Sequence, residues 1–236
     1  SKFARKSKII VIDINKNEHE PTKKKKNLII CDLKYFLKKM NKKKIKLKNN
    51  EWKNKCIFWK KFFPVPITLD NDKKKVGLYR LSKIFSDLMP KKSIFICDSG
   101  FIDVIMPTNI EFSDKQSCIH PVSQGSMGFA IPAAAGIQKV TNRPIICVVG
   151  DGSIMMNLQE LQTIADNKTP TKIFIINNNL YGIIRRRQKI LFRNRTVGTD
   201  KTNGISSPNF KNIAKTFGIK YIGIRNKHNI RDKIKN

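Results

Sequence analysis

Residues 148–153 read Val-Val-Gly-Asp-Gly-Ser and complete an apolar run that starts at Ile145. A short apolar run that ends in glycines and an aspartate is typical of a buried strand followed by a tight turn. A helical pattern over residues 158–166 and a second apolar run over residues 172–177 come next. Since a strand, a helix and another strand in this order pair their strands in parallel, these residues predict a crossover unit of an α/β sheet.

The same alternation continues on both sides of this unit. We predict helices over residues 78–88, 127–140 and 208–217, and strands over residues 94–97 and 219–224. Ser207 is the expected cap of the last helix, Pro208 its first residue, and Gly218 ends it. Parallel strands linked by helices form a doubly wound parallel sheet with helices on both faces, so the fold class is α/β. Ligands bind such sheets beyond the carboxyl ends of the strands.

Residues 1–48 predict a separate, partial α/β unit ahead of this domain. Apolar runs over residues 8–14 and 27–31 are the expected strands. Asp32 is the expected cap of a helix over residues 33–40, whose apolar positions approximate one face. This arrangement is typical of the end of an α/β domain.

Residues 49–78 predict a linker between the two parts of the chain. They are rich in Lys and Asn and contain two prolines, and we expect one short amphipathic helix there. The main domain then spans residues 79–236. Because the sequence begins with Ser1 instead of Met and ends shortly after an expected strand, we expect a fragment that is also truncated at the end of its main domain.

The composition is strongly basic, with 48 Lys+Arg against 17 Asp+Glu and a formal net charge of +31. Such a charge is typical of nucleic-acid partners, so a basic nucleic-acid-binding module is the alternative function of another class. However, Lys outnumbers Arg 38 to 10, whereas proteins that read bases and phosphates favour Arg and interleaved aromatic side chains. We therefore interpret the charge as a compositional bias on solvated faces and expect no nucleic-acid partner.

Hydropathy and cysteine spacing exclude further classes. No apolar run approaches the about 18 residues of a membrane span, and the first residues lack a signal core, so we expect no membrane partner and a cytoplasmic location. The five cysteines are widely spaced, which indicates reduced structural residues and no zinc or redox pair. His19 and His120 have no partner that the spacing identifies, and we expect them to be solvated or satisfied locally.

Asp151 and Asn178 carry the candidate chemistry, because each directly follows a predicted strand. They lie 27 residues apart, which is enough for one crossover helix and a return strand and sets a carboxylate and an amide oxygen side by side. Magnesium prefers oxygen ligands and usually binds a few protein groups plus phosphates. Together with the Leu180 carbonyl these groups give three ligands. Taken singly, either half of the pattern is also compatible with an ordinary turn.

The turn after Gly150 is suited to an anion. Gly150 and Gly152 leave the backbone accessible, so that N–H groups can face a phosphate. Asn157 and Glu160 form a capping-box pattern, which predicts where the next helix begins.

This constellation resembles a known family. Residues 150–152 followed by Asn177 and Asn178 are similar to the cofactor signature of thiamine-diphosphate enzymes, and the surrounding sequence resembles their acetolactate-synthase-like branch. Residues 124–136 are similar to the segment that lies against the aminopyrimidine, and residues 97–100 to the family's Asp-x-Gly turn. Residues 3–14 resemble the end of its middle domain. The resemblance implies the thiamine-diphosphate-binding fold, thiamine diphosphate and Mg²⁺ as cofactors, and leaves FAD open.

The resemblance also implies individual roles. Gly125 would offer its carbonyl to the exocyclic amine of the aminopyrimidine, and Met127 would hold the cofactor bent, so both are assigned as catalytic by positioning. Ser153 and Gly152 would bind the diphosphate. The implied cofactor-binding residues are Asp98, Gly100, Gly125, Ser126, Met127, Gly150, Asp151, Gly152, Ser153, Asn178, Leu180, Tyr181 and Gly182. The implied metal ligands are Asp151, Asn178 and Leu180.

The implied activity is that of a decarboxylating carboligase that acts on a 2-oxo acid, with a simple 2-oxo acid decarboxylase as the alternative within the family. In this family the glutamate that activates the cofactor lies in a pyrimidine-binding domain, usually of a neighbouring subunit. No part of the chain resembles that domain. We therefore expect a homodimer or homotetramer, and no turnover by these 236 residues alone.

Two departures from acetolactate synthase concern the substrate. Phe101 and Ile102 stand where that enzyme has polar residues after the Asp-x-Gly turn, and Arg187 stands in place of a substrate-selecting Trp. An arginine there favours a larger anionic acceptor, although the run of residues 185–187 is also compatible with a solvated face.

Overall fold

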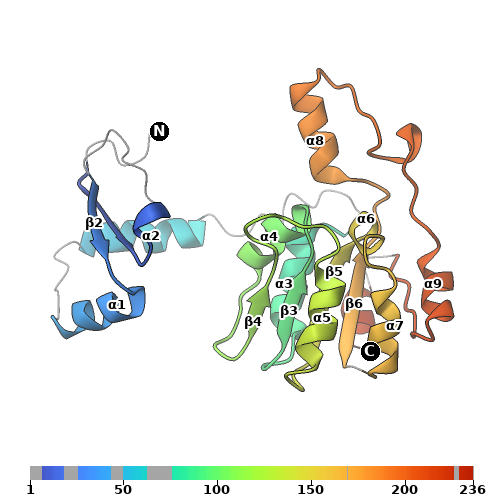
Figure 1. Cartoon of the computed structure of the whole chain (residues 1–236), viewed down its shortest axis with the longest axis horizontal. Helices are drawn as coiled ribbons and strands as arrows, with labels where there is room; N and C mark the ends of the chain where they lie inside the picture. Colours follow the sequence, from blue (N-terminus) through green and yellow to red (C-terminus); the bar gives the residue numbers. More distant parts are fainter. Residues whose placement is uncertain are drawn as a thin grey trace. The chain divides into compact units, whose positions relative to one another are not determined.

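The computed structural model describes residues 7–18, 26–43, 50–62, 76–168, 170–225 and 229–235. It separates into two compact units, Ser1–Phe62 and Phe63–Asn236 (Figure 1). The division falls within the expected linker. The expected domain boundaries themselves stay predictions.

The first unit contains a two-stranded parallel sheet, as the sequence predicts. Strands β1 (Ile9–Asp13) and β2 (Lys26–Ile30) pair in parallel, with a short 3-10 helix, η1 (Lys16–Glu18), after β1. The Asp32 side chain accepts a 3.0 Å hydrogen bond from the Tyr35 N–H, which caps helix α1 (Leu33–Lys42). Helix α2 (Asn50–Phe62) is the helix expected in the linker.

The second unit is built on a four-stranded parallel sheet with the strand order β4-β3-β5-β6. The strands are β3 (Ile94–Cys97), β4 (Ser117–Ile119), β5 (Ile145–Gly150) and β6 (Thr171–Ile176). All four residues of β3 and the first five of β5 are buried. These central strands are apolar on both faces because helices cover both faces.

Two helix layers enclose this sheet (Figure 1). Phe95, Cys97, Ile146 and Val148 belong to a core formed with helices α3 (Leu78–Leu88), α4 (Phe101–Asn109) and α10 (Ile230–Lys235). The alternate residues of the same strands belong to a second core, formed with helices α5 (Ala130–Gln138), α6 (Asp151–Ile154), α7 (Glu160–Asp166) and α9 (Phe210–Thr216). The predicted doubly wound α/β fold is confirmed.

Helix α8 (Gly182–Leu191) and the 3-10 helix η3 (Lys201–Asn203) complete the unit. Figure 1 shows α8 projecting from the sheet at the end where α6 begins. No helix within the described ranges is both long and apolar enough to cross a lipid bilayer.

Three helix starts differ from the predictions. Helix α5 begins at Ala130, because Gly125 and Gly128 have φ values of +60° and +82° and keep the preceding residues in a turn. The capping box of Asn157 and Glu160 is wrong, since the Asn157 amide donates to the Gly128 carbonyl instead. Helix α9 is capped by Asn209, which accepts from two backbone N–H groups, and not by Ser207.

The predicted strand over residues 219–224 is absent. Its carbonyl at Gly223 accepts a 2.8 Å hydrogen bond from the Lys233 ammonium of α10, and Ile224 packs on the first core. Tertiary contacts with α10 therefore replace the strand pairing that the apolar pattern predicts. Among the described elements, the strand β4, the helices α4, α6, α8 and α10, and the 3-10 helices η1 and η3 were not predicted.

Candidate cofactor site

The candidate residues gather at the carboxyl edge of the main sheet, where parallel strands of this fold class bind ligands. Asp98 follows β3, Asp151 follows β5, and residues 177–180 follow β6. The loop of residues 121–129 connects β4 to α5 at the same edge.

Asp151 is the centre of this edge. It is the first residue of α6, and only 4% of its surface is exposed. Its Oδ1 accepts from the Gly152 N–H at 3.0 Å, and its Oδ2 accepts from the Asn179 N–H at 2.6 Å and the Ser207 hydroxyl at 2.7 Å. The carboxylate therefore joins the ends of β5 and β6 to the segment before α9.

The contact between the two strand ends runs through Asn179 and not through the predicted Asn178. Asn179 has a φ of +53°, a left-handed conformation that asparagine tolerates better than most residues. In this conformation the Asn179 N–H points toward the Asp151 carboxylate. Asn178 is exposed at the same edge, and its role as a metal ligand stays a prediction.

Two glycines of the site lie in close contact with aromatic rings. A Cβ on Gly152 would lie 1.9 Å from Cε1 of Tyr181, well inside any permitted contact. A Cβ on Gly182 would lie 3.0 Å from Cδ2 of Phe101. The Tyr181 ring thus lies directly against Gly152 in the turn after β5. This contact brings together three of the expected cofactor-binding residues, namely Gly152, Tyr181 and Gly182.

Asp98 ties the Asp-x-Gly turn to the loop before α5. It is fully buried, and its Oδ1 accepts from the N–H groups of Ser99 and Gly128 at 2.9 and 3.0 Å. Its Oδ2 accepts from the Ala130 N–H at 2.8 Å. A buried carboxylate with several hydrogen bonds at the start of a helix is well stabilised. The observed partners of Asp98 are backbone groups of this chain, and its contact with a cofactor stays a prediction.

The loop that holds Gly125 and Met127 is packed against this turn. A Cβ on Gly125 would lie 3.7 Å from the Ser99 hydroxyl oxygen, and the Gly125 N–H donates to the Pro121 carbonyl at 2.9 Å. Met127 is 37% exposed and Ser126 is exposed, so both side chains are accessible to a ligand. Gly128 has no room for a side chain, because a Cβ would lie 2.6 Å from that of Met156.

Leu180 and Tyr181 are held from the other side by the segment after α8. Leu180 forms an isolated antiparallel bridge with Asp200, and the Tyr181 N–H donates to the Thr199 carbonyl at 2.9 Å. No described residue donates a hydrogen bond to the Leu180 carbonyl. This carbonyl is thus free of competing donors within the described part of the chain.

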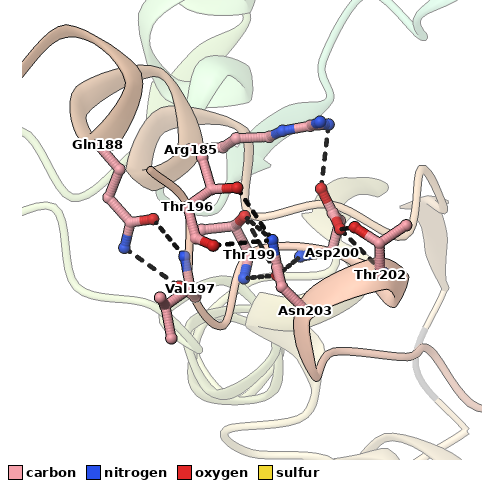
Figure 2. Close-up of polar contacts among 8 residues, drawn as sticks. All are labelled: Arg185, Gln188, Thr196, Val197, Thr199, Asp200, Thr202 and Asn203. Atoms are coloured by element: carbon pink, nitrogen blue, oxygen red, sulfur yellow. Dashed lines mark hydrogen bonds and ion pairs between the residues drawn. The ribbon is translucent and has the colours of Figure 1, made fainter. Parts of the chain in front are cut away.

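Figure 2 shows the polar contacts that join α8 to the segment that ends with η3. We name this group of residues the α8–η3 clasp; its members are Arg185, Gln188, Thr196, Val197, Thr199, Asp200, Thr202 and Asn203. Arg185 Nη1 lies 3.1 Å from Asp200 Oδ2. The Gln188 amide exchanges two hydrogen bonds with the Val197 backbone, and the Asn203 amide oxygen accepts from the backbone of Thr199 and Asp200. Asp200 accepts hydrogen bonds from the hydroxyl and the N–H of Thr202 and lies near the positive charge of Arg185. These interactions, of which the hydroxyl bond is the strongest, hold the pKa of Asp200 below its ordinary value.

The clasp distinguishes Arg185 from its two neighbours in the arginine run of residues 185–187. Arg185 is partly buried and paired with Asp200, whereas Arg186 and Arg187 are exposed on α8. The sequence did not identify this pair, because its members lie on opposite sides of a loop.

His120 has a partner that the sequence did not reveal. Its Nδ1 lies 2.5 Å from Oδ1 of Asp103, and both side chains are mostly buried. His120 follows β4 and Asp103 lies in the first turn of α4. Since neither element was predicted, the contact could not be. His19 lies outside the described residues.

Two of the five cysteines have the buried position expected of structural residues, whereas Cys56 is exposed on α2. All five are free, and Cys97 and Cys147 are buried in β3 and β5. Burial raises the pKa of both thiols far above the ordinary value, and it raises the pKa of Cys118 to about 11. These thiols stay protonated near neutral pH. Within the described residues, no three His, Cys, Asp or Glu side chains are grouped to hold a metal.

The chain is similar to known proteins over the residues that form this site. A family model described as "Thiamine pyrophosphate enzyme, C-terminal TPP binding domain" matches residues 98–236, which is more than half of the chain. The solved structure of the Rhodococcus jostii RHA1 thiamine diphosphate-dependent 4-hydroxybenzoylformate decarboxylase is similar over 70% of this chain and 31% of that one. Its TM-score is 0.60 and its sequence identity 27%.

Several curated relatives are acetolactate synthase large subunits. That of Porphyra purpurea is 43% identical over 112 residues, which is 47% of this chain and 19% of the relative. That of Cyanidium caldarium is 28% identical over an alignment that includes 98% of this chain and 40% of the relative. The isozyme 2 large subunit of Escherichia coli (strain K12) is 34% identical over 140 residues, 59% of this chain and 25% of the relative.

The chain thus spans less than half the length of these curated relatives. The family match covers every expected site residue, from Asp98 to Gly182. The curated relatives to which the chain is similar are acetolactate synthase large subunits, and the family match over more than half of its length shows that the chain belongs to the thiamine pyrophosphate enzymes.

Proposed function

We propose that this chain binds thiamine diphosphate together with Mg²⁺ and contributes to the decarboxylation of a 2-oxo acid. The observation that carries the proposal is the position of Asp151. It is a buried carboxylate at the carboxyl end of β5, joined through Asn179 to the end of β6. Such a carboxylate can anchor a cation between two strand ends, which is the place where a diphosphate is expected.

The donor set at this edge suits magnesium. Asp151, the Asn178 amide and the Leu180 carbonyl are all oxygen donors, which a hard divalent cation prefers over nitrogen and sulfur. The free Leu180 carbonyl and the exposed Asn178 support the fit. In this proposal the three groups hold the ion, and Asp151 supplies the negative charge.

The surroundings of Gly152 and Gly125 support binding of the organic part. Gly152 and Ser153 follow Asp151 in the first turn of α6, where the Ser153 N–H and hydroxyl would donate to a diphosphate while the Gly152 N–H donates to Asp151 Oδ1. Met127 and the Gly125 carbonyl lie across the edge on the loop before α5 and would contact the aminopyrimidine. When bound, thiamine diphosphate supplies the electron sink for decarboxylation next to a carbonyl. The residues of this chain position it.

Two reactions of the family remain open for this chain. Its curated relatives are named acetolactate synthases and its structural neighbour is named a decarboxylase. We favour the carboligase, because the sequence is more similar to that branch over a longer part of the chain. We further propose a homodimer or homotetramer in which a pyrimidine-binding domain from outside these 236 residues completes the site.

The test is calorimetric titration of the 236-residue chain with thiamine diphosphate, in Mg²⁺ and in EDTA. We expect binding in Mg²⁺ only. The substitution Asp151→Asn keeps the shape but removes the charge, so affinity should fall at least about tenfold. The matched control is Asp114→Asn at an exposed loop position, which should bind as wild type.

Absence of metal-dependent binding by the wild-type chain, together with salt-sensitive binding of duplex DNA, would support the nucleic-acid alternative instead. If the cofactor binds, product analysis with pyruvate separates the two reactions, once with and once without an added acceptor aldehyde or oxo acid. A carbon–carbon bond in the product identifies a carboligase. This assay is run with the complementary domain present.

A further inference from the structure

The His120–Asp103 pair lies beside the loop that holds Gly125 and Met127. The carbonyl of His120 accepts from the Val122 N–H at 2.9 Å, and the carbonyl of the next residue, Pro121, accepts from the Gly125 N–H. A displacement of His120 would therefore be transmitted directly to the turn at Gly125.

Asp103 is fixed on the opposite side of this contact. It lies in the first turn of α4, and its N–H donates to the Gly100 carbonyl at 3.1 Å, which joins it to the turn that begins with Asp98. The loop is thus held to this turn at both ends. His120 binds Asp103 at the beginning of the loop, while Gly128 and Ala130 bind Asp98 at its end.

We propose that His120 is a positioning residue, which through its Nδ1 bond to Asp103 fixes residues 121–127 for contact with the aminopyrimidine of thiamine diphosphate. This inference rests on the proposed cofactor. The residues it invokes at the contact are the Gly125 carbonyl and the Met127 side chain. Neither His120 nor Asp103 needs to touch the cofactor.

The charges around the pair support a stable contact. Residues 94–109 and 117–128, which include β3, α4, β4 and the loop, carry five ionisable side chains in all: Asp98, Asp103, His120 and the thiols of Cys97 and Cys118. Both thiols are neutral near pH 7, because burial and the nearby Asp103 charge raise their pKa values. Asp98 is occupied by three backbone N–H groups. No neighbouring side chain among these elements offers His120 a competing acceptor.

The hydrogen-bond geometry persists whether or not the imidazole is charged. A neutral ring keeps its proton on Nδ1, facing the Asp103 carboxylate, and a charged ring donates from the same atom. An asparagine at position 120 can place its amide N–H near Nδ1, whereas an alanine removes the donor. This difference separates a positioning role from a need for the imidazole itself.

The test compares His120→Ala, His120→Asn and Asp103→Ala in the 236-residue chain. Each variant is titrated with thiamine diphosphate and, separately, with inorganic pyrophosphate, both in Mg²⁺. Loss of a hydrogen bond to a charged group should weaken thiamine diphosphate binding about tenfold in both alanine variants. Pyrophosphate binding should not change, since the diphosphate turn is separate. The asparagine variant should recover most of the affinity.

Arg231→Ala is the matched control. It removes an ion pair of the same unit, with Asp87 on α3, and should leave both affinities unchanged. If His120→Ala binds thiamine diphosphate as wild type does, or loses pyrophosphate binding equally, the positioning role is overturned while the proposed function stands.

A second readout covers failure of the proposed function itself. Hydrogen exchange at the Gly125 amide reports on the loop without any cofactor, and it should accelerate about tenfold in both alanine variants. If wild type binds no thiamine diphosphate, the cofactor proposal fails. In that case, an unchanged rate of hydrogen exchange at the Gly125 amide in His120→Ala also overturns the claim that His120 fixes the loop. A faster rate supports this claim.

Discussion

The hydroxyl of Ser207 donates a 2.7 Å hydrogen bond to Oδ2 of Asp151, from a position 56 residues further along the chain. The same oxygen accepts from the Asn179 N–H, so one carboxylate oxygen joins three segments. Ser207 was expected to cap α9. Its side chain instead fixes the orientation of the carboxylate that is proposed to hold the metal.

Replacement Ser207→Ala should destabilise the chain and weaken its metal site. One of two donors to a buried carboxylate oxygen is lost, so the free energy of unfolding should fall by about 1 kcal/mol. Urea denaturation measures this change, and Mg²⁺-dependent titration measures the effect on the site. Ser206→Ala, at the exposed neighbouring position, is the control and should leave both quantities at wild-type values.

Replacement Gly152→Ala should abolish binding of thiamine diphosphate. The added methyl would lie 1.9 Å from the Tyr181 ring, so the ring must move off the turn after β5. This shift should also lower the free energy of unfolding by about 1–3 kcal/mol, as is typical of overpacking. Calorimetry and denaturation report the two effects.

Gly136→Ala is the contrasting substitution. Gly136 lies inside α5, and a Cβ there meets nothing within 4 Å. Alanine is the better helix former, so this variant should gain about 0.5–1 kcal/mol. Equal destabilisation by both glycine substitutions would contradict the packing argument for Gly152.

The parts of the site that the sequence predicts are those fixed by local pattern. The strands before Asp151 and Asn178 contain apolar runs, and Gly150 marks the end of the first run while Asn177 marks the end of the second. Contacts between distant residues were not predictable in this way. Ser207 beside Pro208 carries the local pattern of a helix cap, and nothing nearby in the sequence indicates Asp151 as its partner.

The missed His120–Asp103 contact has a related cause. Strand β4 has only three residues, Ser-Cys-Ile, which form no recognisable apolar run. Helix α4 contains Pro107, which in a sequence indicates a helix end. Without these two elements His120 and Asp103 belong to loops, and only the assembled sheet brings them together.

The α8–η3 clasp should make stability depend on pH through Asp200. Its hydrogen bond to Thr202 and the Arg185 charge lower its pKa in the folded state. A carboxyl with a lowered folded pKa stabilises the fold above its unfolded pKa, about 3.9, and this contribution is lost as pH falls through the folded value. The stability difference between wild type and Asp200→Asn should therefore be largest near pH 6 and shrink below pH 4. A difference that is constant from pH 7 to pH 2.5 would contradict the ionic role.

Arg143 should stabilise the opposite, amino-terminal edge of the sheet without affecting cofactor binding. Its guanidinium donates to the carbonyls of Lys92, Ser93 and Lys115 and to the Ser117 hydroxyl, at 2.7 to 3.1 Å. Replacement Arg143→Ala leaves these acceptors without their shared donor, so the free energy of unfolding should fall by about 1–3 kcal/mol. Arg143→Lys should recover little of it, because one ammonium cannot reach groups that a planar fork spans. Arg195→Ala, at an exposed position, is the control.

The affinity for thiamine diphosphate should not change in Arg143→Ala under conditions in which the variant is folded, because Arg143 precedes β5 and the site follows this strand. A loss of affinity in parallel with the loss of stability would show that the two edges of the sheet are coupled.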